Sequence, residues 1–101
     1  MNNLINLAIQ VLPLYRNSKG ETYAEIDKAI EIIKASGLKY QVTPFETVIA
    51  GGYKETMSVV EQISAELLKT PGADLIINMK LQLSADGDVR MEDKASKYQN
   101  N

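Results

Sequence analysis

The sequence predicts an α+β domain of ferredoxin-like architecture, with one four-stranded antiparallel sheet and two helices on one of its faces. The first observation is the order of hydrophobic periodicities, which alternates between period two and helical spacing as β-α-β-β-α-β. The second is the length of 101 residues, which is typical of one domain. Right-handed crossovers and a central hairpin turn this order into a sheet that is covered on one side only. We expect residues 1–101 to form a single domain.

The N-terminal stretch Leu4–Leu14 alternates in polarity and predicts the first strand. One face would carry Ile5, Leu7, Ile9 and Val11, and the other Asn6, Ala8 and Gln10. After a polar loop, Thr22 and Glu25 form a T-x-x-E capping box, which predicts that the first helix begins there. Gly37 predicts its left-handed end, with Leu38 folding back on the last turn.

A hairpin is expected next, because Lys39–Thr43 and Phe45–Ala50 both read as short strands and Pro44 separates them. The second helix would start after Gly51 and Gly52 and stop before Pro71 and Gly72. Its buried stripe is predicted to contain Met57, Val60, Ile63, Ser64 and Leu67.

The stretch Leu75–Leu83 alternates most regularly and predicts the last strand. One face would carry Leu75, Ile77, Met79, Leu81 and Leu83, and the other Ile76, Asn78, Lys80 and Gln82. A turn at Asp86 and Gly87 follows, and Met91–Tyr98 is predicted to add a short helix.

The composition limits the catalytic groups and metal ligands that the chain can supply. The chain has no Cys and no His, so disulfides, thiolate nucleophiles and the commonest metal ligand and general base are absent from the sequence. The cluster Asp86, Asp88, Glu92 and Asp93 fails the calcium-loop template, because Met91 and Lys97 stand where Gly and Glu are required. We therefore expect no enzyme activity, no metal and no cofactor.

Charge and hydropathy exclude two classes of partner. The net charge is −2 and the basic residues are scattered, whereas nucleic acids and anionic membranes select concentrated basic surfaces. No stretch is apolar for long enough to span a bilayer, and the N-terminus shows no export signal. A cytoplasmic location is the resulting expectation.

The uncovered sheet face is the place where function is expected. By strand parity it should carry the amides Asn6, Gln10, Asn78 and Gln82, with Ala8, Lys80 and Ile76 among them. Neutral hydrogen-bonding side chains among small apolar ones are typical of a ligand pocket or an interface. A solvated sheet face remains the alternative to both.

Residues 36–51, which read SGLKYQVTPFETVIAG, carry a family signature. This block resembles the thiamine-binding protein family, whose members show G-L-x-Y-x-[VL]-x-P-[ML]-x-T-x-[VI]-E-G. The matching positions are Gly37, Leu38, Tyr40, Val42, Pro44, Thr47 and Gly51. The family often has Glu before the last Gly, whereas this chain has Ala50, and Glu46 is the nearest remaining carboxylate.

The resemblance implies a ferredoxin-like domain that forms dimers or tetramers by sheet packing and binds thiamine or its hydroxymethylpyrimidine part. Amide side chains can pair with the donors and acceptors of an aminopyrimidine, and a carboxylate would favour a thiazolium cation. The alternative is a regulatory or scaffolding homo-oligomer whose open face serves only protein contacts. The predicted ligand contacts are Glu46, Thr47, Gln10, Asn78, Asn6 and Tyr40.

Overall fold

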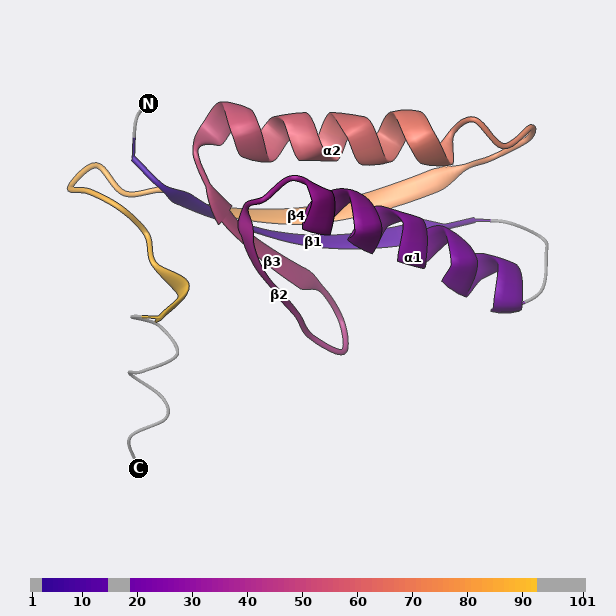
Figure 1. The fold of residues 1–101 in the computed structure, drawn as a ribbon, viewed down its shortest axis with the longest axis horizontal. Coiled ribbons are helices and arrows are strands. Elements are labelled where there is room, and N and C mark those ends of the chain that lie inside the picture. Colours follow the sequence, from indigo (N-terminus) through magenta and orange to yellow (C-terminus); the bar gives the residue numbers. More distant parts are fainter. Residues whose placement is uncertain (1–2, 15–18, 93–101) are drawn as a thin grey trace.

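The computed structural model describes residues 3–14 and 19–92 of the chain. The elements are β1 (Ile5–Pro13), α1 (Lys19–Ala35), β2 (Lys39–Val42), β3 (Thr47–Gly51), α2 (Tyr53–Leu67) and β4 (Leu75–Gln82). The strands pair antiparallel in the order β2-β3-β1-β4, so β1 lies in the centre of the sheet. Both helices pack on the same side of this sheet (Figure 1). The ferredoxin-like α+β fold predicted from the sequence is confirmed.

The core lies between the helices and the sheet face that looks toward them. Alternate residues of β1 and β3 enter it, and each helix adds its apolar stripe, as period-two and period-3.6 patterns require. The buried cluster consists of Leu7, Ile9, Ala29, Ile33, Ile49, Val59, Ile63 and Leu67. Within the described residues, neither α1 nor α2 lies against the opposite face of the sheet (Figure 1).

The first helix begins earlier than the capping box predicts. α1 starts at Lys19, so Thr22 lies inside the helix and the predicted start is wrong. Once a helix is nucleated, each added residue gains a backbone hydrogen bond, which favours extension past a possible cap. Glu25 is instead 8% exposed, and its carboxylate accepts a hydrogen bond from Lys28 Nζ at 2.8 Å. The predicted end is confirmed, because Gly37 adopts a φ of 76° after the last turn.

The buried stripe of α2 differs from the predicted one in its first half. Thr56 and Val59 are buried there, in place of Met57 and Val60, although Val60 still packs against the core. Thr56 can be fully buried because its Oγ1 donates a hydrogen bond to the carbonyl of Gly52 at 2.6 Å. Hydrophobicity alone therefore placed the first half of the stripe one residue away from its true position, whereas Ile63 and Leu67 are buried as predicted.

The last strand is covered over only part of its length. Leu75 and Ile77 pack against the core, whereas Met79, Leu81 and Leu83 are 42%, 40% and 43% exposed. β4 ends at Gln82 and stands at the edge of the sheet. Of the five alternating residues predicted to share one face, Leu75 and Ile77 therefore reach the core, whereas the later three stay partly exposed.

After β4 the chain returns to the start of β1. The amide of Val89 donates to the carbonyl of Leu4 at 3.0 Å, and Asp88 Oδ1 accepts from the amide of Leu4 at 2.7 Å. Glu92 forms an ion pair with Lys39 of β2. Met91 and Glu92 are helical, and the rest of the helix predicted for Met91–Tyr98 lies outside the described residues.

Candidate functional site

Three predicted site residues meet on the open face of the sheet. Gln10 and Asn78 are opposite each other in the β1–β4 register, and Asn78 Nδ2 donates a hydrogen bond to Gln10 Oε1 at 3.2 Å. Glu46 precedes β3 and borders the same hollow of about 330 Å³. This volume is near the lower end of the range for small-molecule sites. That these residues contact a ligand stays a prediction.

The hairpin turn fixes the position of Glu46. The carbonyl of Glu46 accepts hydrogen bonds from the Thr43 amide at 2.9 Å and from Thr43 Oγ1 at 2.6 Å. The Glu46 amide in turn donates to Thr43 Oγ1 at 3.1 Å. Because these three hydrogen bonds hold the backbone of Glu46, its carboxylate projects from a defined place at the edge of the open face. There it forms an ion pair with Lys80 of β4, at 3.4 Å between Nζ and Oε1.

Thr47 and Tyr40 lie on the other side of the sheet. Thr47 pairs with Ile9 and is 7% exposed, and Tyr40 pairs with Ile49 and is 37% exposed. Successive residues of a strand point to opposite faces, so Thr47 cannot share a face with Glu46. The structure therefore does not bring these two predicted site residues to the open face.

Asn6 has the predicted strand parity but is covered by the segment that follows β4. Its side chain is 3% exposed, and Nδ2 donates a hydrogen bond to the carbonyl of Val89 at 2.9 Å. Its Oδ1 is buried and finds no partner among the described residues. A segment more than eighty residues away in sequence thus covers Asn6, and a contact between Asn6 and a ligand stays a prediction.

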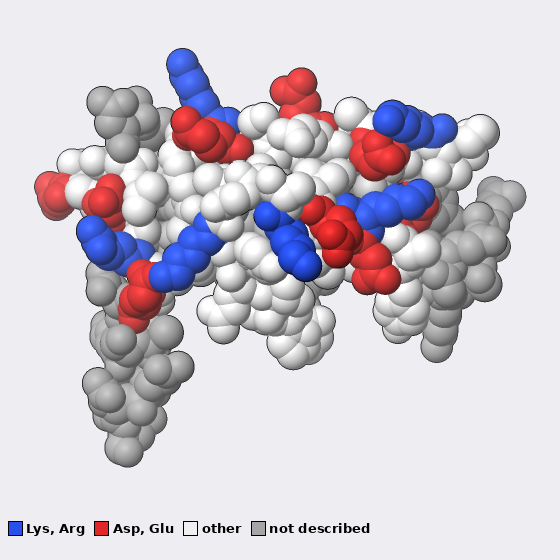
Figure 2. Space-filling model, viewed as in Figure 1, with Lys and Arg blue, Asp and Glu red and all other residues white. Residues whose placement is uncertain are grey.

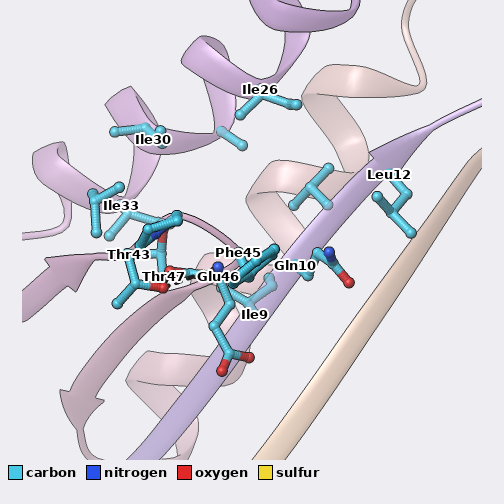
Figure 3. Close-up of a pocket in the computed structure, with 14 residues that line it drawn as sticks. Ile9, Gln10, Leu12, Ile26, Ile30, Ile33, Thr43, Phe45, Glu46 and Thr47 are labelled. Atoms are coloured by element: carbon cyan, nitrogen blue, oxygen red, sulfur yellow. Dashed lines mark hydrogen bonds between the residues drawn. The ribbon is translucent and has the colours of Figure 1, made fainter.

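A second hollow, on the helix side, reaches the same hairpin tip. It has a volume of about 210 Å³ and lies between α1, the end of β1 and the β2–β3 turn. In Figure 3, Ile26, Ile30 and Ile33 of α1 line up above the hairpin tip. Gln10, Phe45 and Glu46 border both this cleft and the open-face hollow. The hairpin tip is therefore a boundary between an apolar cleft and a polar one.

Two residues of this region were not among the predicted contacts. Phe45 is 81% exposed at the hairpin tip, and Lys80 holds the Glu46 carboxylate. The parity of the last strand places Lys80 on the open face, and this is the signal that pointed to it. For Phe45 the sequence signal is the preceding Pro44, which breaks the strand and leaves the aromatic ring in a turn.

The helix layer offers a weaker candidate. The groove between α1 and α2 is lined by charged side chains, including Asp27, Lys28, Glu31, Glu66 and Lys69. The pKa of Glu66 is lowered because Lys69 donates a hydrogen bond to its carboxylate and adds a positive charge beside it. Figure 2 shows acidic and basic side chains interspersed over this face of the molecule, without a broad patch of one sign. Such a surface is typical of solvated helices.

Two classes of feature are absent from residues 3–14 and 19–92. No cluster of three or more potential metal-ligating Asp or Glu side chains occurs there. None of the helices in this part of the chain has the length and apolar character required to cross a membrane.

The fold and the site define a small ferredoxin-like domain with a polar hollow on its uncovered sheet face. The profile of the thiamine-binding protein family matches residues 7–99, and the chain belongs to this family. A UPF0045 protein from Clostridium perfringens is 32% identical over 93 residues, which cover 92% of this chain and 95% of that protein.

Solved structures of similar proteins share the fold. A Thermotoga maritima protein, described as a candidate for thiamine biosynthesis or salvage, has a TM-score of 0.83 and 29% identity. The match covers 95% of this chain and 99% of that one. A domain of unknown function from Bacillus cereus has a TM-score of 0.86 and 26% identity, over 99% and 94% of the two chains.

Proposed function

We propose that this protein is a non-catalytic binding protein for thiamine or its hydroxymethylpyrimidine moiety, acting as a cytoplasmic homo-oligomer. The observation that carries the proposal is the meeting of Gln10, Asn78 and Glu46 around one open-face hollow of about 330 Å³. Membership of the thiamine-binding protein family supports the choice of ligand.

The chemistry of the hollow suits an aminopyrimidine. Each amide side chain offers a carbonyl acceptor and two N–H donors, which is the complement of an exocyclic amine beside a ring nitrogen. Gln10 and Asn78 use one donor and one acceptor on each other, and the remaining groups stay available for a ligand. Glu46 can accept from the amine or balance the charge of a thiazolium ring.

Binding rather than catalysis is proposed because of the groups that the hollow contains. The sequence has no His or Cys, so acid–base or nucleophilic catalysis would require carboxylates, amines or hydroxyls. The charged groups at the hollow, Glu46 and Lys80, form an ion pair with each other. Opposite charges beside neutral amides favour recognition of a polar heterocycle.

A thermal-shift series with thiamine and hydroxymethylpyrimidine tests the proposal directly. A ligand that binds the native state at one hundred times its Kd adds about 2.7 kcal/mol of stability. For a domain of this size that raises the Tm by about 10–20 °C. No shift with either compound at millimolar concentration would contradict the proposal.

Calorimetry on site variants locates the binding. Glu46→Gln should weaken binding by about 1.5–3 kcal/mol, as expected for loss of a hydrogen bond to a charged group. Thr47→Val tests whether the helix-side cleft takes part, because Thr47 borders that cleft and not the open-face hollow. Gln62→Ala, which removes an exposed amide on α2, is the matched control. If the Glu46 variant binds like the parent, the site is wrong.

The alternative function is a regulatory or scaffolding homo-oligomer whose open face only contacts other copies. The exposed apolar residues Leu12 and Ile76, which pair across β1 and β4 on this face, favour it. Under this alternative the oligomer would form and no thiamine-related compound would change its stability.

A further inference from the structure

The Glu46–Lys80 ion pair stands between two hollows on the open face. The first, of about 330 Å³, is bordered by Gln10 and Asn78, and the second, of about 290 Å³, by Ala8 and Val48. Both hollows are bordered by Glu46 and by Lys80. The two side chains therefore form a partition across what is otherwise one continuous trough.

The register of the sheet explains how the pair can cross the central strand. Lys80 is paired with Ala8 of β1, and Ala8 is paired on its other side with Val48 of β3. Because Ala8 ends at its β-carbon, the long lysine side chain can extend over it. A larger residue at this position would block the path from β4 to Glu46.

The Glu46–Lys80 ion pair is weak enough for a ligand to separate it. The distance of 3.4 Å is long for an ion pair, and the Lys80 side chain is 78% exposed. Exposed pairs of this kind contribute little to stability, because solvent screens them and ordering two long side chains costs entropy. A ligand that supplies a better partner to each charge would separate the pair with little loss.

Once separated, the two charges could each bind a group of the opposite sign on a ligand. Among the described residues that border the hollows, Lys80 is the one cation and Glu46 the one anion. Glu46 suits an amine or a cationic ring, whereas Lys80 would repel a cation and has three N–H donors for an anionic group. The trough therefore fits a molecule with both kinds of group.

We propose that Lys80 binds the phosphate of the ligand, so that this face selects a phosphate monoester of thiamine or hydroxymethylpyrimidine over the unphosphorylated compound. The inference rests on the proposed function, since it takes the aminopyrimidine ligand as given. It adds the chemical class of the preferred ligand and a specificity-determining residue that was not among the predicted contacts.

Isothermal titration calorimetry with four compounds tests this inference. The probes are thiamine, thiamine monophosphate, hydroxymethylpyrimidine and its phosphate, each titrated into the parent and into Lys80→Met. The parent should bind each phosphorylated compound about tenfold or more tighter than its unphosphorylated counterpart, as expected for a charge-assisted hydrogen bond. The Met variant should lose this preference and bind unphosphorylated thiamine at least as well as the parent.

Two further variants separate charge from a structural effect. Lys80→Arg keeps the charge and should keep the preference, and Lys54→Met removes an exposed lysine of α2 and should also keep it. Equal affinity for both forms in the parent, or a preference that survives in Lys80→Met, would overturn the inference and leave the proposed function intact. Failure of the parent to bind any of the four compounds would overturn the proposed function as well.

Discussion

A second copy of this chain is expected to cover the open face of the sheet, and two apolar residues make this testable. Leu12 and Ile76 pair across β1 and β4, and they are 36% and 45% exposed. The double variant Leu12→Ser with Ile76→Ser removes this apolar surface from one end of the face. Because neither residue belongs to the buried core, the fold of the single chain should persist.

The expected effect on association follows from these exposed fractions. Together the two residues expose somewhat less than one full aliphatic side chain, whose burial contributes about 1.5–3 kcal/mol. A twofold interface uses the same patch on both copies, which doubles the contribution. The double variant should therefore weaken the dimer by about 2.5–5 kcal/mol, or roughly two to three and a half orders of magnitude in Kd.

Light scattering coupled to size exclusion at low micromolar concentration measures the outcome. The parent should have a mass that is a multiple of 11.2 kDa, and the double variant should shift to 11.2 kDa. Met79→Ser with Leu81→Ser is the matched control, since these residues are 42% and 40% exposed on the helix-facing side of β4. A monomeric parent, or dissociation by the control pair alone, would refute the reasoning.

The other predictions concern the core, the site, the C-terminal segment and metals. Ile49→Ala should lower the free energy of unfolding in urea by about 2–5 kcal/mol, because Ile49 is fully buried. Val48→Ala, half-buried on the open face, should cost less, and equal losses would contradict the assignment of faces. Gln10→Ala should weaken thiamine binding about two- to tenfold in calorimetry; unchanged affinity would exclude Gln10 from the site. Asn6→Ala should speed hydrogen exchange at the Val89 amide, and full protection in the variant would show that Asn6 does not anchor this segment. EDTA should leave the melting curve unchanged, whereas a stoichiometric metal and a large loss of stability on its removal would contradict this expectation.

Local patterns determined the elements of this protein and the faces of its strands. Period-two alternation fixed which residues of β1 and β4 share a face, and the structure places Gln10 opposite Asn78 on that basis. Gly37 ended the first helix as expected, because a left-handed residue costs least there when it is Gly. Such features depend on a few neighbouring residues and are therefore readable from the sequence.

Packing, rather than local sequence signals, determined where α1 starts and which residues of α2 are buried. Thr22 and Glu25 form a plausible cap, yet α1 runs through them from Lys19. In α2 the burial of Thr56 was hidden by its polarity, which its hydrogen bond to Gly52 offsets. Both errors arise because local propensity is small in energy beside the gain from a well-packed helix.

Tertiary structure alone determined which residues of the open sheet face are covered. Asn6 and Gln10 have the same parity on β1, but the segment around Val89 buries the first and leaves the second beside the hollow. In the same way, Glu46 and Lys80 stand 34 residues apart and meet because the sheet brings the start of β3 and the edge strand β4 to either side of β1. The sequence by itself determined the fold, the strand faces and the family signature. The accessible site depended on contacts between distant segments, whose relative positions no local periodicity encodes.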